Sequence, residues 1–74
     1  MTGSQLIKMA LVYRNITEAE LARRLKISPQ LLNSRFKADK FTIKDMENIA
    51  DVLECEFEYN IRFKDGYIIK GKGE

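Results

Sequence analysis

Apolar residues recur every three or four positions through the first fifty residues, and this spacing predicts helices. In the second of the expected helices Leu21, Ala22 and Leu25 share one face. Each apolar stretch begins at a hydroxyl residue suited to a helix N-cap: Ser4 or Thr2, then Thr17, Ser28 and Thr42. Thr17 with Glu20, and Thr42 with Asp45, have capping-box spacing. We therefore predict four helices, at about residues 4–14, 17–25, 28–38 and 42–53.

The hydrophobic period changes from about 3.6 to 2 at Glu54, which predicts a strand. Apolar side chains then alternate with polar ones up to Phe63, and the Asp65-Gly66 pair indicates a two-residue hairpin of type I′. The hairpin should cover about residues 56–70, with Phe63 opposite Ile68 and Arg62 opposite Ile69, and residues 70–74 should form a frayed tail. The chain is thus predicted to be one mainly α domain, 1–74, with a C-terminal two-stranded antiparallel β-hairpin.

Composition narrows the functional classes. The 74 residues include no His and a single cysteine, Cys55, so the commonest acid–base catalyst and the Cys/His zinc spacings are both missing. We expect no enzymatic activity, no metal, no cofactor and no small-molecule ligand. The N-terminus lacks the pattern of a signal peptide and no apolar run is long enough to span a bilayer, so we expect a cytoplasmic protein that contacts no membrane. Cys55 should be a small buried residue where the last helix meets the hairpin.

Residues 17–36 carry the most informative pattern: a capped helix, a short turn at Lys26-Ile27 and a second capped helix. The run TEAELARRLKISPQ, with Leu21, Ala22, Leu25, Ile27 and Leu32 at the packing positions, resembles the helix-turn-helix of phage repressors and Cro-like bacterial regulators. The resemblance covers roughly residues 4–53 and implies a lambda-repressor-like fold. Two positions depart from that family: Lys26 stands where Gly is usual, and Arg35 replaces an apolar residue, so we expect Phe36 to point inward instead.

With Leu32 and Phe36 inward, the third helix should present one outward polar stripe. Its members are Gln30, Asn33, Ser34 and Lys37. Gln and Asn side chains can bind adenine through two hydrogen bonds, and Lys can donate to guanine. The family resemblance implies that the start and outer face of this helix enter the major groove, which indicates Gln30, Asn33 and Ser34 by position. With Lys37 from the same stripe, these are the predicted base contacts. The alternative is an ordinary solvated helix face.

The formal charge of +2 conceals an uneven distribution. Between Arg23 and Lys44 there are seven basic residues and one acidic residue, Asp39, which leaves the remainder of the chain acidic. Such a cluster suits neutralisation of DNA phosphates, although it could also serve solubility alone. The predicted phosphate contacts are Thr17, Arg23, Arg24, Lys26, Ser28, Lys40 and Lys44.

The hairpin has more apolar side chains than one short helix face needs. Either it completes the monomer core against the first and fourth helices, or hairpins from two chains associate through Phe57, Tyr59, Ile61, Phe63 and Ile69. Two-fold association would place two reading helices on successive major-groove half-sites. We therefore predict sequence-specific double-stranded DNA binding by a small homodimeric transcriptional regulator that acts as a repressor. The alternative is a protein-interaction module, such as an antitoxin-like component that binds a partner protein through the hairpin.

Overall fold

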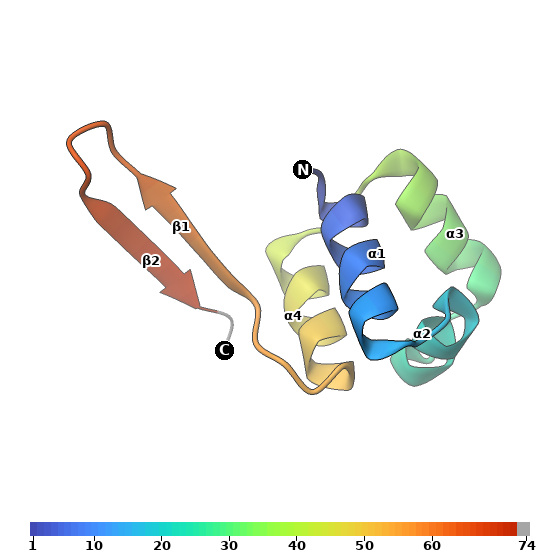
Figure 1. Ribbon diagram of the computed structural model, residues 1–74. Coiled ribbons are helices and arrows are strands. Elements are labelled where there is room, and N and C mark those ends of the chain that lie inside the picture. The colour runs from blue at the N-terminus through green and yellow to red at the C-terminus, as the bar shows by residue number, and fades with distance from the viewer. Residues whose placement is uncertain (73–74) are drawn as a thin grey trace.

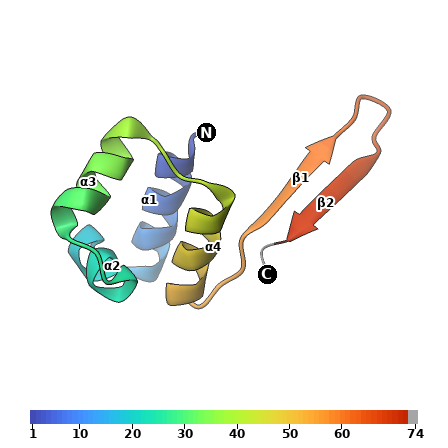
Figure 2. The same cartoon turned by 180° about the vertical axis from the view of Figure 1, so that it is seen from behind.

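The computed structural model describes residues 1–72 and has four helices followed by a two-stranded antiparallel hairpin (Figure 1). The helices are α1 (Gly3–Arg14), α2 (Glu18–Leu25), α3 (Pro29–Ala38) and α4 (Ile43–Val52), and the strands are β1 (Glu58–Arg62) and β2 (Ile68–Lys72). The predicted fold class is confirmed. Helix α3 and the hairpin lie at opposite ends of the molecule, with α1 and α4 between them, and the view from behind agrees (Figures 1 and 2).

The helix starts follow from local side-chain chemistry. Thr17, Ser28 and Thr42 each accept a hydrogen bond from the backbone N–H three residues later, and Thr2, not Ser4, does the same for α1. The capping boxes of α1 and α4 are complete. In α2 only half of the predicted box is formed: Glu20 does not bind back to Thr17, because its carboxylate binds two arginines instead.

Three of the helices end in a left-handed residue that is not glycine. Asn15, Lys26 and Asp39 have φ of 57°, 60° and 52°. Asn and Asp tolerate this conformation, whereas for Lys it costs about 1 kcal/mol. Lys26 therefore occupies the left-handed turn position with an ordinary side chain where the family usually has Gly.

The hydrophobic core lies among the four helices. Leu21 and Ala22 of α2 are completely buried, and the small Ala22 allows neighbouring helices to approach α2 closely. Leu32 and Phe36 of α3 are buried as well, so the predicted inward orientation of Phe36 is confirmed. The buried apolar residues are Ile7, Leu11, Leu21, Ala22, Leu32, Phe36, Met46, Ile49, Ala50 and Leu53.

The hairpin register differs from the prediction. Ile61 lies opposite Ile69 and Arg62 opposite Ile68, so Phe63 faces Tyr67, whose carbonyl accepts its N–H. The cause is the loop, which has three residues, 64–66, with positive φ only at Gly66; a type I′ turn needs positive φ at Asp65 as well. The predicted frayed tail is also wrong in part, since β2 continues to Lys72, and residues 73–74 lie outside the described part of the chain.

The hairpin does not complete the core of its own chain. All five residues of β1 are exposed, and of the five predicted interface residues only Phe57, which precedes the strand, packs against the helical core. Cys55 is exposed, so its predicted burial is wrong: the chain leaves the helical body here and nothing in residues 1–72 covers the thiol. The interpretation of the hairpin as part of the monomer core is therefore incorrect.

The longest helix, α1, has 12 residues. No helix in the described part of the chain is long and apolar enough to cross a membrane.

Candidate nucleic-acid interface

Helix α3 presents the predicted polar stripe to solvent. Gln30, Asn33, Ser34 and Lys37 are all exposed, on the side opposite the buried Leu32 and Phe36. Within residues 1–72 none of these four side chains forms a hydrogen bond or an ion pair. The stripe is therefore available to donors and acceptors from outside the chain. Leu31, beside it, is 43% exposed and adds an apolar surface.

The start of α3 is fixed by a helix cap, and its flank is held by an ion pair with α4. The Ser28 hydroxyl accepts the Leu31 N–H, and Pro29 occupies the first helical turn, so the helix starts at a defined residue. Arg35, on the flank of α3, pairs with Asp45 of α4 at 3.7 Å. This contact explains why a charged residue is acceptable where the family often has an apolar one: its side chain is only half-buried and has a partner.

Three predicted phosphate-contact lysines surround α3. Lys26 lies in the turn between α2 and α3, Lys40 follows α3, and Lys44 is in the first turn of α4. All three are exposed, and the structure from residue 1 to residue 72 gives them no ion pair. Their charges are thus unneutralised on the elements that flank the stripe.

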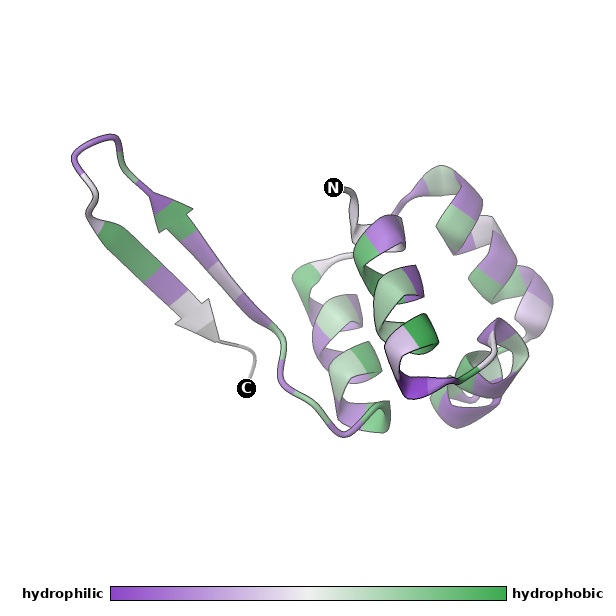
Figure 3. Ribbon diagram, in the orientation of Figure 1, coloured by the Kyte–Doolittle hydropathy of each residue, from purple (hydrophilic) through white to green (hydrophobic). Residues whose placement is uncertain are grey.

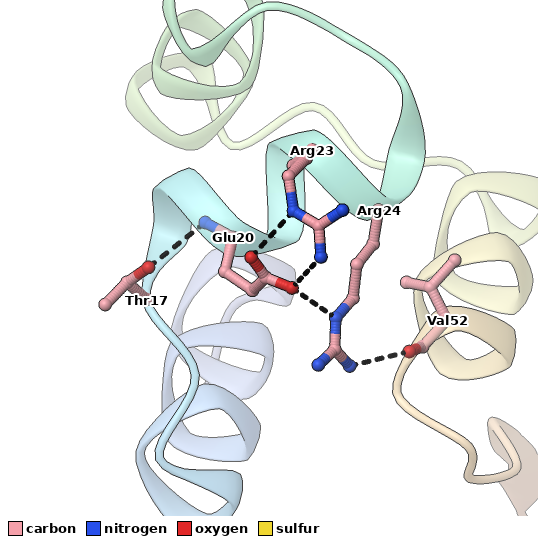
Figure 4. Close-up of polar contacts among 5 residues, drawn as sticks. All are labelled: Thr17, Glu20, Arg23, Arg24 and Val52. Atoms are coloured by element: carbon pink, nitrogen blue, oxygen red, sulfur yellow. Dashed lines mark hydrogen bonds and ion pairs between the residues drawn. The ribbon is translucent and has the colours of Figure 1, made fainter.

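The two arginines of α2 are already engaged within the chain (Figure 4). Glu20 accepts hydrogen bonds from Arg23 Nε at 2.9 Å and from Arg24 Nε at 2.9 Å, and pairs with Arg23 Nη2. Arg24 also donates to the carbonyl of Val52 at 3.2 Å. Hydrogen bonds from Arg23 and then Arg24 lower the pKa of Glu20 to about 2. Arg24 thus ties α2 to the end of α4, a role the charge pattern did not predict.

The hydroxyls of Thr17 and Ser28, the remaining predicted phosphate contacts, accept backbone hydrogen bonds from Glu20 and Leu31. A capping hydroxyl keeps its own proton to donate. Both residues are exposed, so that proton faces solvent at the start of α2 or α3.

The sequence pattern does not predict three long-range hydrogen bonds of the structure. The Asp39 carboxylate accepts the Ser4 N–H at 2.9 Å, and the Ser4 hydroxyl donates to the Phe36 carbonyl at 3.0 Å. The hydrogen bond from the Ser4 backbone lowers the pKa of the Asp39 carboxyl, and a hydrogen bond from the Ser4 side chain lowers it further by a smaller amount. Arg14 donates to the carbonyl of Leu53. All three bonds join residues more than thirty positions apart, so helix periodicity contains no signal for them.

The four helices and the exposed, capped α3 define a helix-turn-helix domain of the DNA-binding kind. A family model described as "Helix-turn-helix" matches residues 6–60, and the chain belongs to this family, the Cro/C1-type helix-turn-helix proteins. The family consists of DNA-binding transcription regulators, and the chain is therefore of that type. No curated protein and no solved structure shows a significant match.

Proposed function

We propose that the chain is a dimeric repressor that reads a specific operator through α3. One observation carries this proposal: Gln30, Asn33, Ser34 and Lys37 form a continuous exposed stripe on the second helix of the motif, and their polar groups have no partner within residues 1–72. A major groove supplies acceptors and donors that match these groups.

The surrounding charges support placement of this helix against DNA. Lys26, Lys40 and Lys44 would contact phosphates on either side of the groove, and the hydroxyls of Thr17 and Ser28 would donate to phosphate oxygens. Arg23 and Arg24 would contribute less than their formal charges indicate, because Glu20 neutralises part of them. We therefore rank the unpaired lysines above the paired arginines as phosphate contacts.

Dimerisation through the hairpin would bring two copies of α3 to one operator of approximate two-fold symmetry. Repression would then be steric, since the bound dimer would exclude polymerase from the same DNA. Support for the dimer comes from Tyr59, Ile61, Phe63 and Ile69, which are large, apolar and exposed, and from Phe57 at the base of the hairpin.

Selection of duplexes from a random pool at a stated salt concentration tests the proposal. A dimeric reader should enrich an inverted repeat. Asn33→Ala and Gln30→Ala should each relax preference at one position per half-site, by about 1–3 kcal/mol. Glu18→Ala, on the exposed surface of α2, is a matched control and should leave the preference unchanged. Failure to enrich any motif would contradict sequence-specific binding.

The exposed apolar face of the hairpin also favours a second candidate function, binding of a partner protein in the manner of an antitoxin component. In that case the chain would stay monomeric at high micromolar concentration. Light scattering of the wild type against Tyr59→Glu distinguishes the two, because only a hairpin-dependent homodimer loses mass on substitution.

A further inference from the structure

Lys8 of α1 is a basic residue that lies outside the basic segment from Arg23 to Lys44. Its Nζ atom lies over the ring of Phe36 of α3, 5.2 Å from the ring centroid. The negative face of an aromatic ring attracts a cation, so this contact holds the lysine side chain at the seam between α1 and α3. Hydrophilic residues interrupt the apolar ones along both of these helices (Figure 3). Lys8 therefore brings a positive charge to α3 from a helix outside the helix-turn-helix motif.

Two hydrogen bonds fix α1 against the C-terminal half of α3. The Ser4 hydroxyl donates to the Phe36 carbonyl at 3.0 Å, and the Asp39 carboxylate accepts the Ser4 N–H at 2.9 Å. Each bond satisfies a backbone group that a helix end leaves without a partner, one near the end of α3 and one at the start of α1. Ser4 and Lys8 are four positions apart, so they share one face of α1. That face, and Lys8 with it, is turned toward α3.

Helix geometry places this seam beside the polar stripe of α3. Asn33 precedes Phe36 by three residues, about one sixth less than a full turn, so the two side chains differ by about 60° around the helix axis. Arg35 lies in the other rotational direction from Phe36 and pairs with Asp45 of α4. The stripe is therefore bordered by α1 on the Asn33 side and by α4 on the Arg35 side.

The ammonium group of Lys8 is available to a ligand from outside the chain. The residue is exposed, and within residues 1–72 its side chain forms no hydrogen bond and no ion pair. The Asp39 carboxylate in the same seam is bound to the Ser4 N–H and does not pair with Lys8. An ammonium group has three N–H donors and no acceptor, so the ligand that suits it is an anion.

A helix in the major groove has a phosphate backbone along each of its two flanks. Lys26 precedes α3, Lys40 follows it and Lys44 lies on the α4 side, so none of these three lysines belongs to the α1 flank. We propose that Lys8 binds a DNA phosphate on the α1 flank of α3, and that α1 is thereby part of the surface that contacts the DNA backbone. This inference rests on DNA reading by α3 in the proposed function and adds a contact from outside the motif.

The salt dependence of binding tests this contact, with the full chain on a selected duplex and on a random-sequence duplex of equal length. Lys8→Gln should lower the slope of log affinity against log salt by about 1 on both duplexes, because one fewer phosphate is neutralised. It should leave the sequence preference unchanged, since a phosphate contact carries no base information. Lys8→Arg keeps the charge and should keep the slope. Lys64→Gln, in the hairpin loop at the opposite end of the molecule from α3, is the matched control and should also keep the slope.

The outcomes distinguish the Lys8 contact from DNA reading as a whole. An unchanged slope for Lys8→Gln beside a lowered slope for Lys40→Ala overturns the Lys8 contact and leaves α3 as the reading helix. Unchanged slopes for both variants overturn the placement of α3 against DNA as well. An equal loss of slope in Lys64→Gln means that the slope reports total charge, and a preference altered at one base position means that Lys8 contacts a base; either result overturns the phosphate contact. Circular dichroism verifies that Lys8→Gln keeps the helical content of the wild type.

Discussion

Glu20 is the residue whose ionisation matters most for the α2 network. Its pKa in the folded chain, about 2, lies below the ordinary value of 4.5 because Arg23 and Arg24 hydrogen-bond the charged form. A carboxyl with a lowered pKa stabilises the fold fully above its unfolded pKa, and that contribution is lost as pH falls from about 4.5 through about 2.

We therefore expect the Tm of the wild type to fall more steeply between pH 5 and pH 2 than the Tm of Glu20→Gln. The glutamine variant lacks the ionisable group and should already be less stable at pH 7. Thermal melts followed by circular dichroism at a series of pH values measure this, with Glu18→Gln as the control for removal of an α2 carboxylate. Parallel pH profiles for wild type and Glu20→Gln would show that the network adds no stability.

Lys26 combines a conformational cost with a candidate phosphate contact. Its φ of 60° is unfavourable for a lysine and easy for glycine. Lys26→Gly should raise the free energy of unfolding by about 0.5–1 kcal/mol, the relief of strain being partly offset by the greater freedom of glycine in the unfolded chain.

The same substitution should weaken DNA binding, because it removes an unpaired charge. Lys26→Ala separates the two effects, since alanine removes the charge and keeps a side chain at positive φ. Urea titrations and binding at several salt concentrations measure them on the three chains. A Lys26→Gly variant with unchanged DNA affinity would remove Lys26 from the phosphate contacts.

At the scale of elements, we expect the basic residues of α2 and those around α3 to contribute unequally to DNA binding. Lys40, after α3, has no ion pair within residues 1–72, whereas Arg24 is held by Glu20 and the Val52 carbonyl. Lys40→Ala should therefore lower the slope of log affinity against log salt by about 1, with little effect on stability.

Arg24→Ala should affect the stability of the fold more than the salt dependence of DNA binding. Its loss should change the salt slope by less than half of the Lys40 effect and lower the free energy of unfolding by about 1 kcal/mol, as the link from α2 to α4 is lost. Salt-dependent binding and urea titration on both variants decide this. Equal salt effects from the two residues would mean that Arg24 leaves Glu20 when DNA binds.

The elements that the sequence predicts well depend on local chemistry. Thr17, Ser28 and Thr42 act within three residues of their partners, so capping patterns place the helices to within one or two residues. The outward stripe of α3 follows from helix periodicity for the same reason. Its contact with bases stays a prediction.

The features that the sequence predicts poorly depend on distant parts of the chain or on small conformational differences. Cys55 is exposed although the sequence predicts burial, and its exposure follows from the direction in which the hairpin leaves α4. The register error arose because Asp65-Gly66 fits two loop lengths, and only the φ of Asp65 separates them. The Asp39 contact with Ser4 crosses 35 positions and has no local pattern.

At the scale of the whole molecule, the helical body and the hairpin are structurally separate. The buried core lies entirely between Ile7 and Leu53, and Phe57 is the last apolar side chain packed against it. The molecule is elongated, 43 × 24 × 21 Å, with α3 and the hairpin at opposite ends (Figure 2). The proposed DNA reading and the proposed assembly therefore draw on different surfaces, and we expect a change in one surface to leave the other intact.

A chain that ends at Glu58 tests this separation. It keeps Phe57 and every buried core residue, so we expect its helical circular dichroism to match the full chain per helical residue and its melting to stay cooperative. It should be monomeric. Its affinity for a DNA half-site should stay within about threefold of the full chain, whereas affinity for a complete inverted repeat should fall by about tenfold or more, because the two half-sites are no longer linked.

Full-length Tyr59→Glu is the matched control for the shortened chain, since it keeps the hairpin backbone and charges one position of the apolar face. If assembly depends on that face, both proteins should show the same loss on the inverted repeat and the same retained binding to the half-site. Loss of half-site binding in the shortened chain alone would mean that the hairpin itself contacts DNA. Its basic residues Arg62, Lys64 and Lys70 would then be the first to substitute.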